Sequence, residues 1–482
     1  MRRRPALRAA VLTLALGAVA SLSGCAPAVT VGTLTWSACG GGLLCSTLPV
    51  PVDHAAPGGP TLDLAVVRVP ARDPDRRIGA LFVNPGGPGG SGVDMVRNTA
   101  SGFDEETLDR FDIIGFDPRG VEASAAVRCG FEKHPELEEL EGAELDAAIA
   151  AACRENAGDV LPHLTTAAAA RDLDLLRHAL GDERLSYLGF SYGTVLGATY
   201  ADLFPERVRV MVLDSALDPV EWFGDRAPLE RRNAIAFGAA FDAFAAGCVR
   251  NERACAFGGS DPAGGLDRLL DRAGSTGIPV PGEEPLDRED VIGAVTSGLY
   301  DDAMWPGLGA ALHAAENGDG SDLYEIIVQR ERRDGRRGNY TDANFSIICG
   351  DGTDRPDPAE RAERDADLDG LSPVFGKMAS VGGNVCAAWP EPAEPYRPAA
   401  EISGTPRVLV VNTTGDPATP LEGALALADR FDDAALVIVD GWQHGVYATG
   451  NTCVDEIVGR YLADPTTVSG RTTCPAPQAG AG

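Results

Sequence analysis

Short apolar runs alternate with helical patterns along much of this chain, and this alternation restricts the possible folds more than any other feature. The helical patterns span residues 167–180 and 192–204. The apolar runs are rich in Val, Ile, Leu and Phe and occupy residues 80–84, 111–117, 185–190, 208–214, 407–412 and 435–440. Runs without polar alternation are typical of strands buried on both faces. The order of elements therefore predicts an α/β fold, with a mostly parallel central sheet and helices on both faces.

The alternation stops after residue 214 and resumes only at residue 407. The sequence between these points is helical and rich in loops, which indicates a large insertion into the sheet domain. We therefore expect a first core segment at 61–214, which opens with the strand-like stretch TLDLAVVRVP, and a mainly helical cap at 215–400. The second core segment is expected at 401–476.

The N-terminus has the pattern of an export signal. Four arginines precede an apolar run at 9–20 that is too short to span a membrane but is typical of a signal peptide. The run leads into Leu-Ser-Gly-Cys25, which resembles the lipobox of bacterial lipoprotein signals. The sequence predicts a signal peptide at 1–24, a lipid on Cys25 that anchors the protein to the outer face of the cytoplasmic membrane, and a tether and N-terminal segment at 25–60. Ordinary secretion is the alternative.

The charge balance argues against one class of partner. The chain of 482 residues has 41 Lys and Arg against 71 Asp and Glu, a formal net charge of −30. A surface of this sign repels the phosphates of nucleic acid, so no nucleic acid is expected as a partner. The same excess of acid serves solubility, and it would attract cationic substrates.

The cysteines suit an oxidising compartment. With Cys25 set aside for lipidation, ten of the 11 cysteines remain, at positions 39, 45, 129, 153, 248, 255, 349, 386, 453 and 474. Pairing each with its sequence neighbour would close short and medium loops, although connectivity does not follow from spacing alone. No CxxC pair occurs and the six histidines are scattered, so neither a metal nor another cofactor is expected.

A pentapeptide with a serine at its centre lies between a predicted strand and a predicted helix. Gly189-Phe190-Ser191-Tyr192-Gly193 matches G-x-S-x-G in the context of a nucleophile elbow. The flanking residues must be small because the serine occupies a strained turn. We therefore predict Ser191 as the nucleophile of a hydrolase.

A serine hydroxyl needs a base, and in α/β hydrolases the acid and the histidine follow the serine after late strands. Asp416 follows the strand-like run RVLVVN, at the sheet edge where such folds place their sites. His444 follows the run ALVIVD and is the only histidine beyond Asp416. We predict that His444 is the general base and acid and that Asp416 orients it. An Asp-Pro turn and an ordinary loop histidine are the structural alternatives.

A glycine-rich loop follows an early strand, with the sequence NPGGPGGSG at residues 84–92. Its backbone N–H groups can stabilise a developing oxyanion, and we predict Gly87 and Tyr192 as the two donors. A flexible loop and a phosphate-binding loop are the alternatives, but the Gly-Lys-Ser/Thr ending of phosphate-binding loops is missing.

Together these motifs make the chain resemble the secreted tripeptidyl aminopeptidases of actinobacteria, which are relatives of proline iminopeptidase among the α/β-hydrolase peptidases. The matching stretches are NPGGPGGSG at 84–92, GFDPRG at 115–120, LSYLGFSYGTVLGATYADLFP at 185–205, VLDSALDP at 212–219 and GDPATP at 415–420. CAAWP at 386–390 and the region of Cys453, Tyr461 and Cys474 resemble the family's TAP-like terminal part. Glu122 and Gln443 depart from it, because glycine is usual at both positions.

The resemblance implies an α/β-hydrolase fold and an exported aminopeptidase, of tripeptidyl specificity, that acts on peptide substrates through an acyl-enzyme on Ser191. It also implies cap carboxylates that hold the substrate's α-ammonium group, without indicating which. Two other functions stay open. An esterase or lipase would use the same three residues, because the fold and the triad set acyl transfer and the pocket sets the acyl group. A non-catalytic lipoprotein that delivers peptides to a transporter would suit the anchor and the acidic surface.

Overall fold

A computed structural model describes residues 34–476, except 135–136, 138–139, 141, 252–254, 334–337 and 381–384. The predicted signal peptide and Cys25 lie outside the described residues. Within the described part of the chain, no helix is both long and apolar enough to cross a membrane.

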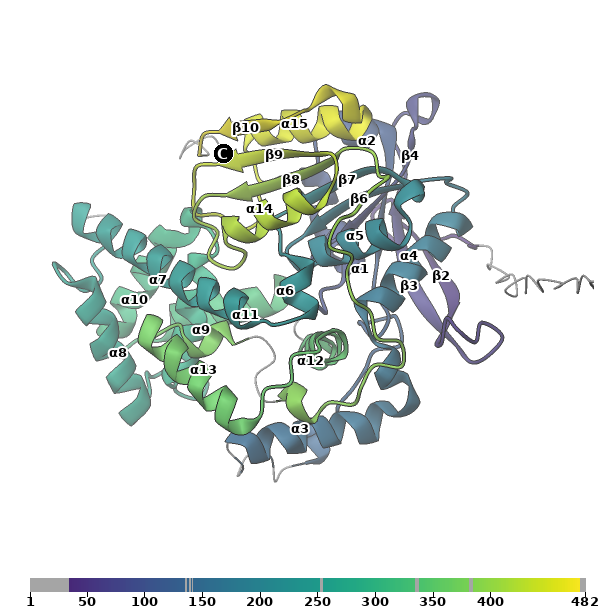
Figure 1. The fold of residues 1–482 in the computed structure, drawn as a ribbon. Coiled ribbons are helices and arrows are strands. Elements are labelled where there is room, and N and C mark those ends of the chain that lie inside the picture. Colours follow the sequence, from purple (N-terminus) through teal and green to yellow (C-terminus); the bar gives the residue numbers. More distant parts are fainter. Residues whose placement is uncertain are drawn as a thin grey trace, which may run out of the picture. The chain divides into compact units, whose positions relative to one another are not determined.

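One mixed sheet organises the described chain (Figure 1). Its order is β1-β2-β3-β5-β4-β6-β7-β8-β9-β10. The strands are β1 (Ser37–Ala38), β2 (Leu44–Pro51), β3 (Thr61–Val69), β4 (Gly79–Asn84), β5 (Phe111–Phe116), β6 (Leu185–Phe190), β7 (Val208–Asp214), β8 (Val408–Thr413), β9 (Ala434–Val439) and β10 (Arg471–Cys474). The pairings from β1 to β5 through β2 and β3 are antiparallel, and all the others are parallel. This agrees with the predicted, mostly parallel sheet.

Helices cover both faces of the sheet because successive strand residues point to opposite sides. In β4, Phe82 packs in one apolar core with α4 (Thr166–Ala179), α5 (Tyr192–Leu203) and α14 (Leu421–Arg430). Val83 points the other way, into a second core with helices α1 (Gly92–Thr99), α2 (Glu105–Arg110) and α15 (Thr452–Ala463). Both faces are therefore buried, which explains the continuous apolar runs in the sequence.

The sheet begins earlier than the predicted core boundary at residue 61. Strands β1 and β2 lie within 25–60, the range expected to be a tether and N-terminal segment, and β2 pairs with β3 along its whole length. Pro49 and Pro51 interrupt the pattern of β2, because proline is unusual inside a strand, and so hide it from sequence analysis. Strand β10 was not predicted either, since its sequence RTTC is short and polar.

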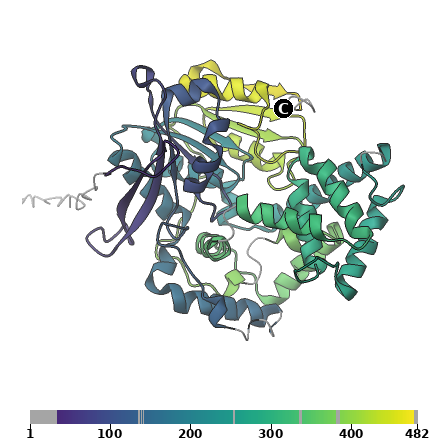
Figure 2. The same ribbon diagram turned by 180° about the vertical axis from the view of Figure 1, so that it is seen from behind.

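The sequence between β7 and β8 forms helices. They are α6 (Pro219–Phe223), α7 (Ala227–Arg250), α8 (Pro262–Thr276), α9 (Arg288–Leu299), α10 (Trp305–Glu316), α11 (Ser321–Arg333), α12 (Tyr340–Asp351) and α13 (Pro358–Leu371). Helices α7 to α10 share an apolar core of their own, to which the phenylalanines of α7 contribute. Figures 1 and 2 show that the parallel strands point towards these helices.

Helix α12 differs from the rest of this insertion in its packing. Its residues Ala343 and Ile347 belong to an apolar cluster that also contains Leu164, Tyr192 and Val195. It contacts α4 of the sheet domain and the 3-10 helix η9 (Val385–Ala388). Although α12 lies within the predicted cap range, it packs onto the core beside the predicted nucleophile elbow.

Five disulfides join each cysteine of the described chain to its sequence neighbour. They are Cys39–Cys45, Cys129–Cys153, Cys248–Cys255, Cys349–Cys386 and Cys453–Cys474. The connectivity that spacing left open is therefore the neighbour pairing. Another helix, α3 (Gly142–Ala157), is tied to the core through Cys153.

Candidate active site

The turn between β6 and α5 carries Ser191 in a strained conformation. Its φ is 55° and its ψ is −126°, a region that residues other than glycine rarely occupy. The amide of Ser191 donates to the carbonyl of Asp214 on β7, 2.9 Å away, which ties the turn to the neighbouring strand. A Cβ at Gly189 would lie 2.4 Å from the carbonyl oxygen of Gly193, and a Cβ at Gly193 would lie 2.9 Å from the carbonyl oxygen of Asn84, so both positions require glycine. The structure thus has the sharp elbow that the pentapeptide predicts.

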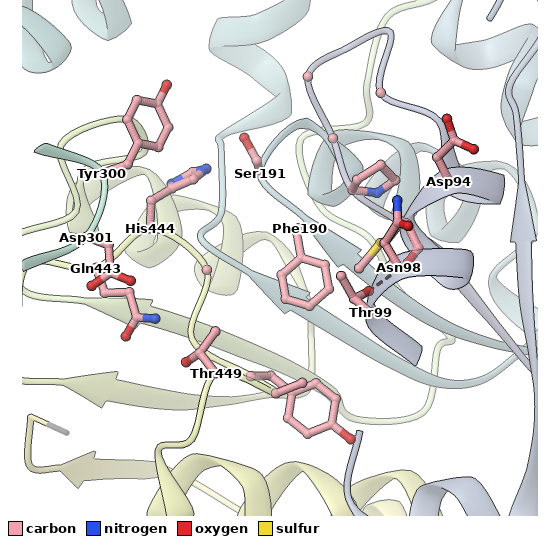
Figure 3. Close-up of a pocket in the computed structure, with 18 of the residues that line it drawn as sticks. Asp94, Asn98, Thr99, Phe190, Ser191, Tyr300, Asp301, Gln443, His444 and Thr449 are labelled. Atoms are coloured by element: carbon pink, nitrogen blue, oxygen red, sulfur yellow. Dashed lines mark hydrogen bonds between the residues drawn. The ribbon is translucent and has the colours of Figure 1, made fainter. Parts of the chain in front are cut away.

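Asp416 and His444 come together beside this elbow. Asp416 follows β8 and is 1% exposed, and His444 follows β9. The Nδ1 atom of His444 lies 2.9 Å and 3.0 Å from the two carboxylate oxygens of Asp416. Figure 3 shows the Ser191 side chain and the His444 ring directed towards each other. The three residues predicted as a triad therefore meet in space.

Thr419 also contacts the acid, and sequence analysis missed it. Its hydroxyl donates to Asp416 Oδ2 at 2.8 Å and lies 3.2 Å from His444 Nδ1. The amides of Ala418 and Thr419 donate to Asp416 Oδ1 at 2.9 Å and 2.8 Å. A threonine three residues after an aspartate is the pattern of such a local turn, so the signal was present in GDPAT.

The loop that holds His444 is attached both to the sheet domain and to the insertion between β7 and β8. The His444 amide donates to the carbonyl of Tyr300 in the insertion at 2.8 Å, and the Tyr300 and His444 rings pack edge-on with their centroids 5.2 Å apart. Asp214 Oδ2 accepts the amides of Val446 and Tyr447 at 3.0 Å and 2.8 Å. Burial raises the pKa of Asp214 to about 6, although these amides and the nearby His444 act in the opposite direction. The histidine loop is thus fixed by a buried carboxyl group that sequence analysis did not single out.

A cavity of about 740 Å³ opens beside these groups. Ser191, His444 and Gly87 line it, together with Tyr300 and Tyr340 from the insertion between β7 and β8. A cavity of this size accommodates a small ligand or a short peptide.

The two predicted oxyanion donors lie on different elements. Gly87 lies in the loop after β4, while Tyr192 is the first residue of α5, where a helix leaves its N–H groups without internal partners. The Tyr192 side chain points away from the cavity and is 3% exposed.

The charged residues of the cavity lining are acidic. Asp94 from α1 and Asp301 from the insertion both line it, and the described lining residues include no Lys or Arg. Figure 3 shows the two aspartates on either side of Ser191 in that view. Asp301 precedes Asp302, whose pKa is raised by burial and by the charge of Asp301. In the described part of the chain, no three His, Cys, Asp or Glu side chains are grouped to hold a metal ion.

Comparison with known proteins decides the family. Residues 79–259 match the model of the alpha/beta hydrolase fold, and residues 372–474 match that of TAP-like proteins. Serine protease Hip1 of Mycobacterium tuberculosis is 35% identical, over 90% of this chain and 88% of that protein. The tripeptidyl aminopeptidase of Streptomyces lividans is 33% identical, over 89% of this chain and 83% of that protein. Carboxylesterase B of Mycobacterium tuberculosis is 36% identical, over 88% and 84% respectively.

The chain belongs to the TAP-like family of α/β hydrolases. The predicted fold and family are confirmed, and as a TAP-like α/β hydrolase the chain is an enzyme of the serine hydrolase class.

The structure also locates the two departures from the usual TAP-like sequence. Glu122 has a φ of 39°, the left-handed region in which glycine is favoured, and its carboxylate accepts the amide of Asn339 at 2.9 Å. Gln443 lines the cavity next to His444. Thus Glu122 contacts the start of α12, whereas Gln443 is the departure that lines the cavity of this TAP-like enzyme.

Proposed function

We propose that this chain is an extracytoplasmic serine aminopeptidase, of tripeptidyl specificity, that hydrolyses peptides through an acyl-enzyme on Ser191. The observation that carries the proposal is the grouping of Ser191 and His444 in one acidic cavity, with Asp416 bound to the far side of the imidazole. The names of the relatives from Mycobacterium and Streptomyces, a serine protease and a tripeptidyl aminopeptidase, support peptides as substrates.

The chemical steps follow from these groups. Asp416 accepts a hydrogen bond from the N–H at His444 Nδ1, which leaves Nε2 free to take the hydroxyl proton as Ser191 Oγ bonds to the scissile carbonyl carbon. The N–H groups of Gly87 and Tyr192 stabilise the oxyanion. The C–N bond then breaks, and the leaving amine takes the proton from His444. Water then bonds to the acyl carbon as His444 takes one of its protons; the bond from that carbon to Ser191 Oγ breaks, and His444 returns the proton to Oγ.

Asp301 is our candidate for binding the α-ammonium group of the substrate. It comes from the insertion, lines the cavity and lies beside a second carboxyl group, Asp302. Asp94 is less suited, since Arg97 Nη1 lies 3.5 Å from its Oδ1 and offsets part of its charge. A cavity whose charged groups are acidic favours a free amine over a blocked one.

An exported, lipid-anchored location completes the proposal. Five disulfides in the described chain suit an oxidising compartment, and the apolar run at 9–20 leads into Leu-Ser-Gly-Cys25. A Cys25→Ser variant expressed in the native host should lose its lipid and move from the detergent phase to the aqueous phase. Equal partition of both forms would contradict the anchor and leave plain secretion.

The decisive experiment measures release of a fluorescent amine from free and N-acetylated di- and tripeptide amides, beside simple esters. We expect turnover of free-amine tripeptides and none by Ser191→Ala. Turnover of esters alone would instead support an esterase, the second candidate, to which Carboxylesterase B is the similar protein. Tight binding of peptides without turnover would indicate a peptide-binding lipoprotein.

A further inference from the structure

Helix α12 contacts both segments that carry the proposed oxyanion donors. In its first half, Asn344 donates from Nδ2 to the carbonyl of Pro88, the residue after Gly87, at 2.9 Å. A Cβ at Gly89 would lie 2.9 Å from the carbonyl oxygen of Tyr340 and 3.1 Å from the amide nitrogen of Asn344. The glycine-rich loop therefore packs directly on the helix backbone.

The other end of α12 reaches the elbow through a buried chain of hydrogen bonds. Asp351, which is 5% exposed, accepts the amide of Thr166 at 2.7 Å and its hydroxyl at 2.5 Å. The Thr166 hydroxyl is in turn bonded to the hydroxyl of Tyr192. Since the single hydroxyl proton of Thr166 goes to Asp351, Tyr192 is the donor to Thr166. The chain runs from the residue after the nucleophile to the last residue of α12.

Packing reinforces this chain. Trp222 donates from Nε1 to Asp351 Oδ2 at 2.9 Å, and its ring lies 5.3 Å from the Tyr192 ring. Both aromatic side chains are buried. With its hydroxyl and ring both held, Tyr192 cannot rotate its backbone N–H without breaking buried contacts.

The start of α12 is fixed to the sheet domain as well. Asn339, the N-cap residue, donates from Nδ2 to the carbonyls of Gly120 and Val127, both at 2.7 Å. Its Oδ1 accepts the amide of Glu122 at 2.8 Å, and its own amide donates to the Glu122 carboxylate. Glu122, a departure from the family pattern, thus adds a side-chain contact to this anchor.

We propose that α12 aligns the two oxyanion donors, with Asp351 as the positioning residue for Tyr192 and Asn344 as the positioning residue for Gly87. This inference rests on the proposed function for the identity of the donors. Neither positioning residue lines the cavity. Each acts through the backbone that it holds, and an inserted helix therefore becomes a structural part of the catalytic centre.

The test uses Thr166→Val and Asp351→Asn, with Thr166→Ser as the conservative variant that keeps the hydroxyl. Ser346→Ala is the matched control, because that buried hydroxyl on α12 donates to the carbonyl of Asp342 within the helix. Two rates are measured for each protein: peptide turnover and labelling of Ser191 by a fluorophosphonate. In labelling, the Ser191 oxygen bonds to phosphorus, fluoride leaves, His444 takes the proton, and the phosphoryl oxygen needs the same donors.

We expect Thr166→Val and Asp351→Asn to lower kcat and the labelling rate about 10- to 100-fold, with KM changed less than about twofold. Thr166→Ser and Ser346→Ala should stay within about threefold of wild type. The double variant of Thr166 and Asp351 should fall no further than the worse single one, because the two residues act as one chain. Asn344→Ala should likewise lower kcat with little change in KM.

Other outcomes are equally clear. Wild-type rates in Thr166→Val would overturn the role of α12. So would rates that fall only in proportion to the melting temperature, with KM and kcat changed alike. If wild type is labelled at Ser191 but cleaves no peptide, the proposed function fails while the labelling rates still test α12. If Ser191 of the wild type is not labelled, both proposals are wrong.

Discussion

Nδ1 of His444 lies 2.9 Å from Oδ1 and 3.0 Å from Oδ2 of Asp416, so the carboxylate faces one edge of the imidazole with both oxygens. An imidazole held in this way carries its proton on Nδ1 and keeps Nε2 basic on the side of Ser191. The geometry therefore sets the tautomer, and it can be tested without changing the nucleophile.

Asp416→Asn should lower kcat by about 10⁴, with little change in KM, because an amide that donates to Nδ1 favours the wrong tautomer. The shape of the side chain is preserved, so the protein should fold normally. Steady-state kinetics against the best peptide substrate check this. A loss below about tenfold would mean that another acid orients His444, and Asp214, buried in the same region, would be the next residue to substitute.

Asp301→Asn should raise KM for free-amine tripeptide amides by about 10-fold, because a charged hydrogen bond to the ammonium group contributes on the order of 1.5 kcal/mol. KM for N-acetylated substrates and for esters should stay unchanged, because they have no free ammonium group. Asp94→Asn is the matched control and should have the smaller effect, since Arg97 offsets part of the charge of Asp94. A larger rise in KM from Asp94→Asn than from Asp301→Asn would place the substrate's amine beside Asp94 instead.

The stability of the protein should depend on pH through Asp214. Its pKa is raised to about 6 by burial, so its contribution is fully present below the unfolded pKa near 3.8 and is lost as pH rises through 6. Between pH 4 and pH 8 the titration of this one group should lower the free energy of unfolding by about 2 kcal/mol. Asp214→Asn should remove that part of the pH dependence of the unfolding free energy, measured in urea. The same slope in both proteins would show that Asp214 does not titrate in this range.

The Cys349–Cys386 disulfide should contribute more stability than Cys39–Cys45. It closes a loop with a sequence separation of 37 and links α12 to η9, whereas Cys39–Cys45 closes a loop with a separation of 6 near the N-terminus. Chain entropy predicts losses of about 4 and about 2 kcal/mol when each pair is replaced by alanine. Guanidinium unfolding of the two double variants gives the comparison. An equal or reversed order would mean that loop entropy is not the main term.

Much of the sheet domain could be predicted because its signals are local. The strand at 185–190 and the helix beginning at residue 192 agree with β6 and α5, since an apolar run and a 3.6-residue period each depend on adjacent residues. Strand β2 was missed because its prolines obscure the pattern, and β10 because its short polar sequence carries none.

The sequence by itself determined which residues are candidates for the chemistry: Ser191 in its glycine-flanked turn, and Asp416 and His444 after late strands. It also holds ten cysteines besides Cys25, an even set. The tertiary structure alone decided what surrounds them. The contacts of Thr166 with Asp351 and of Glu122 with Asn339 join positions 185 and 217 residues apart. No local pattern encodes such pairs, because they depend on how the chain folds back on itself. The acidic lining of the cavity and the place of α12 beside the elbow arise in the same way, from segments far apart in the sequence.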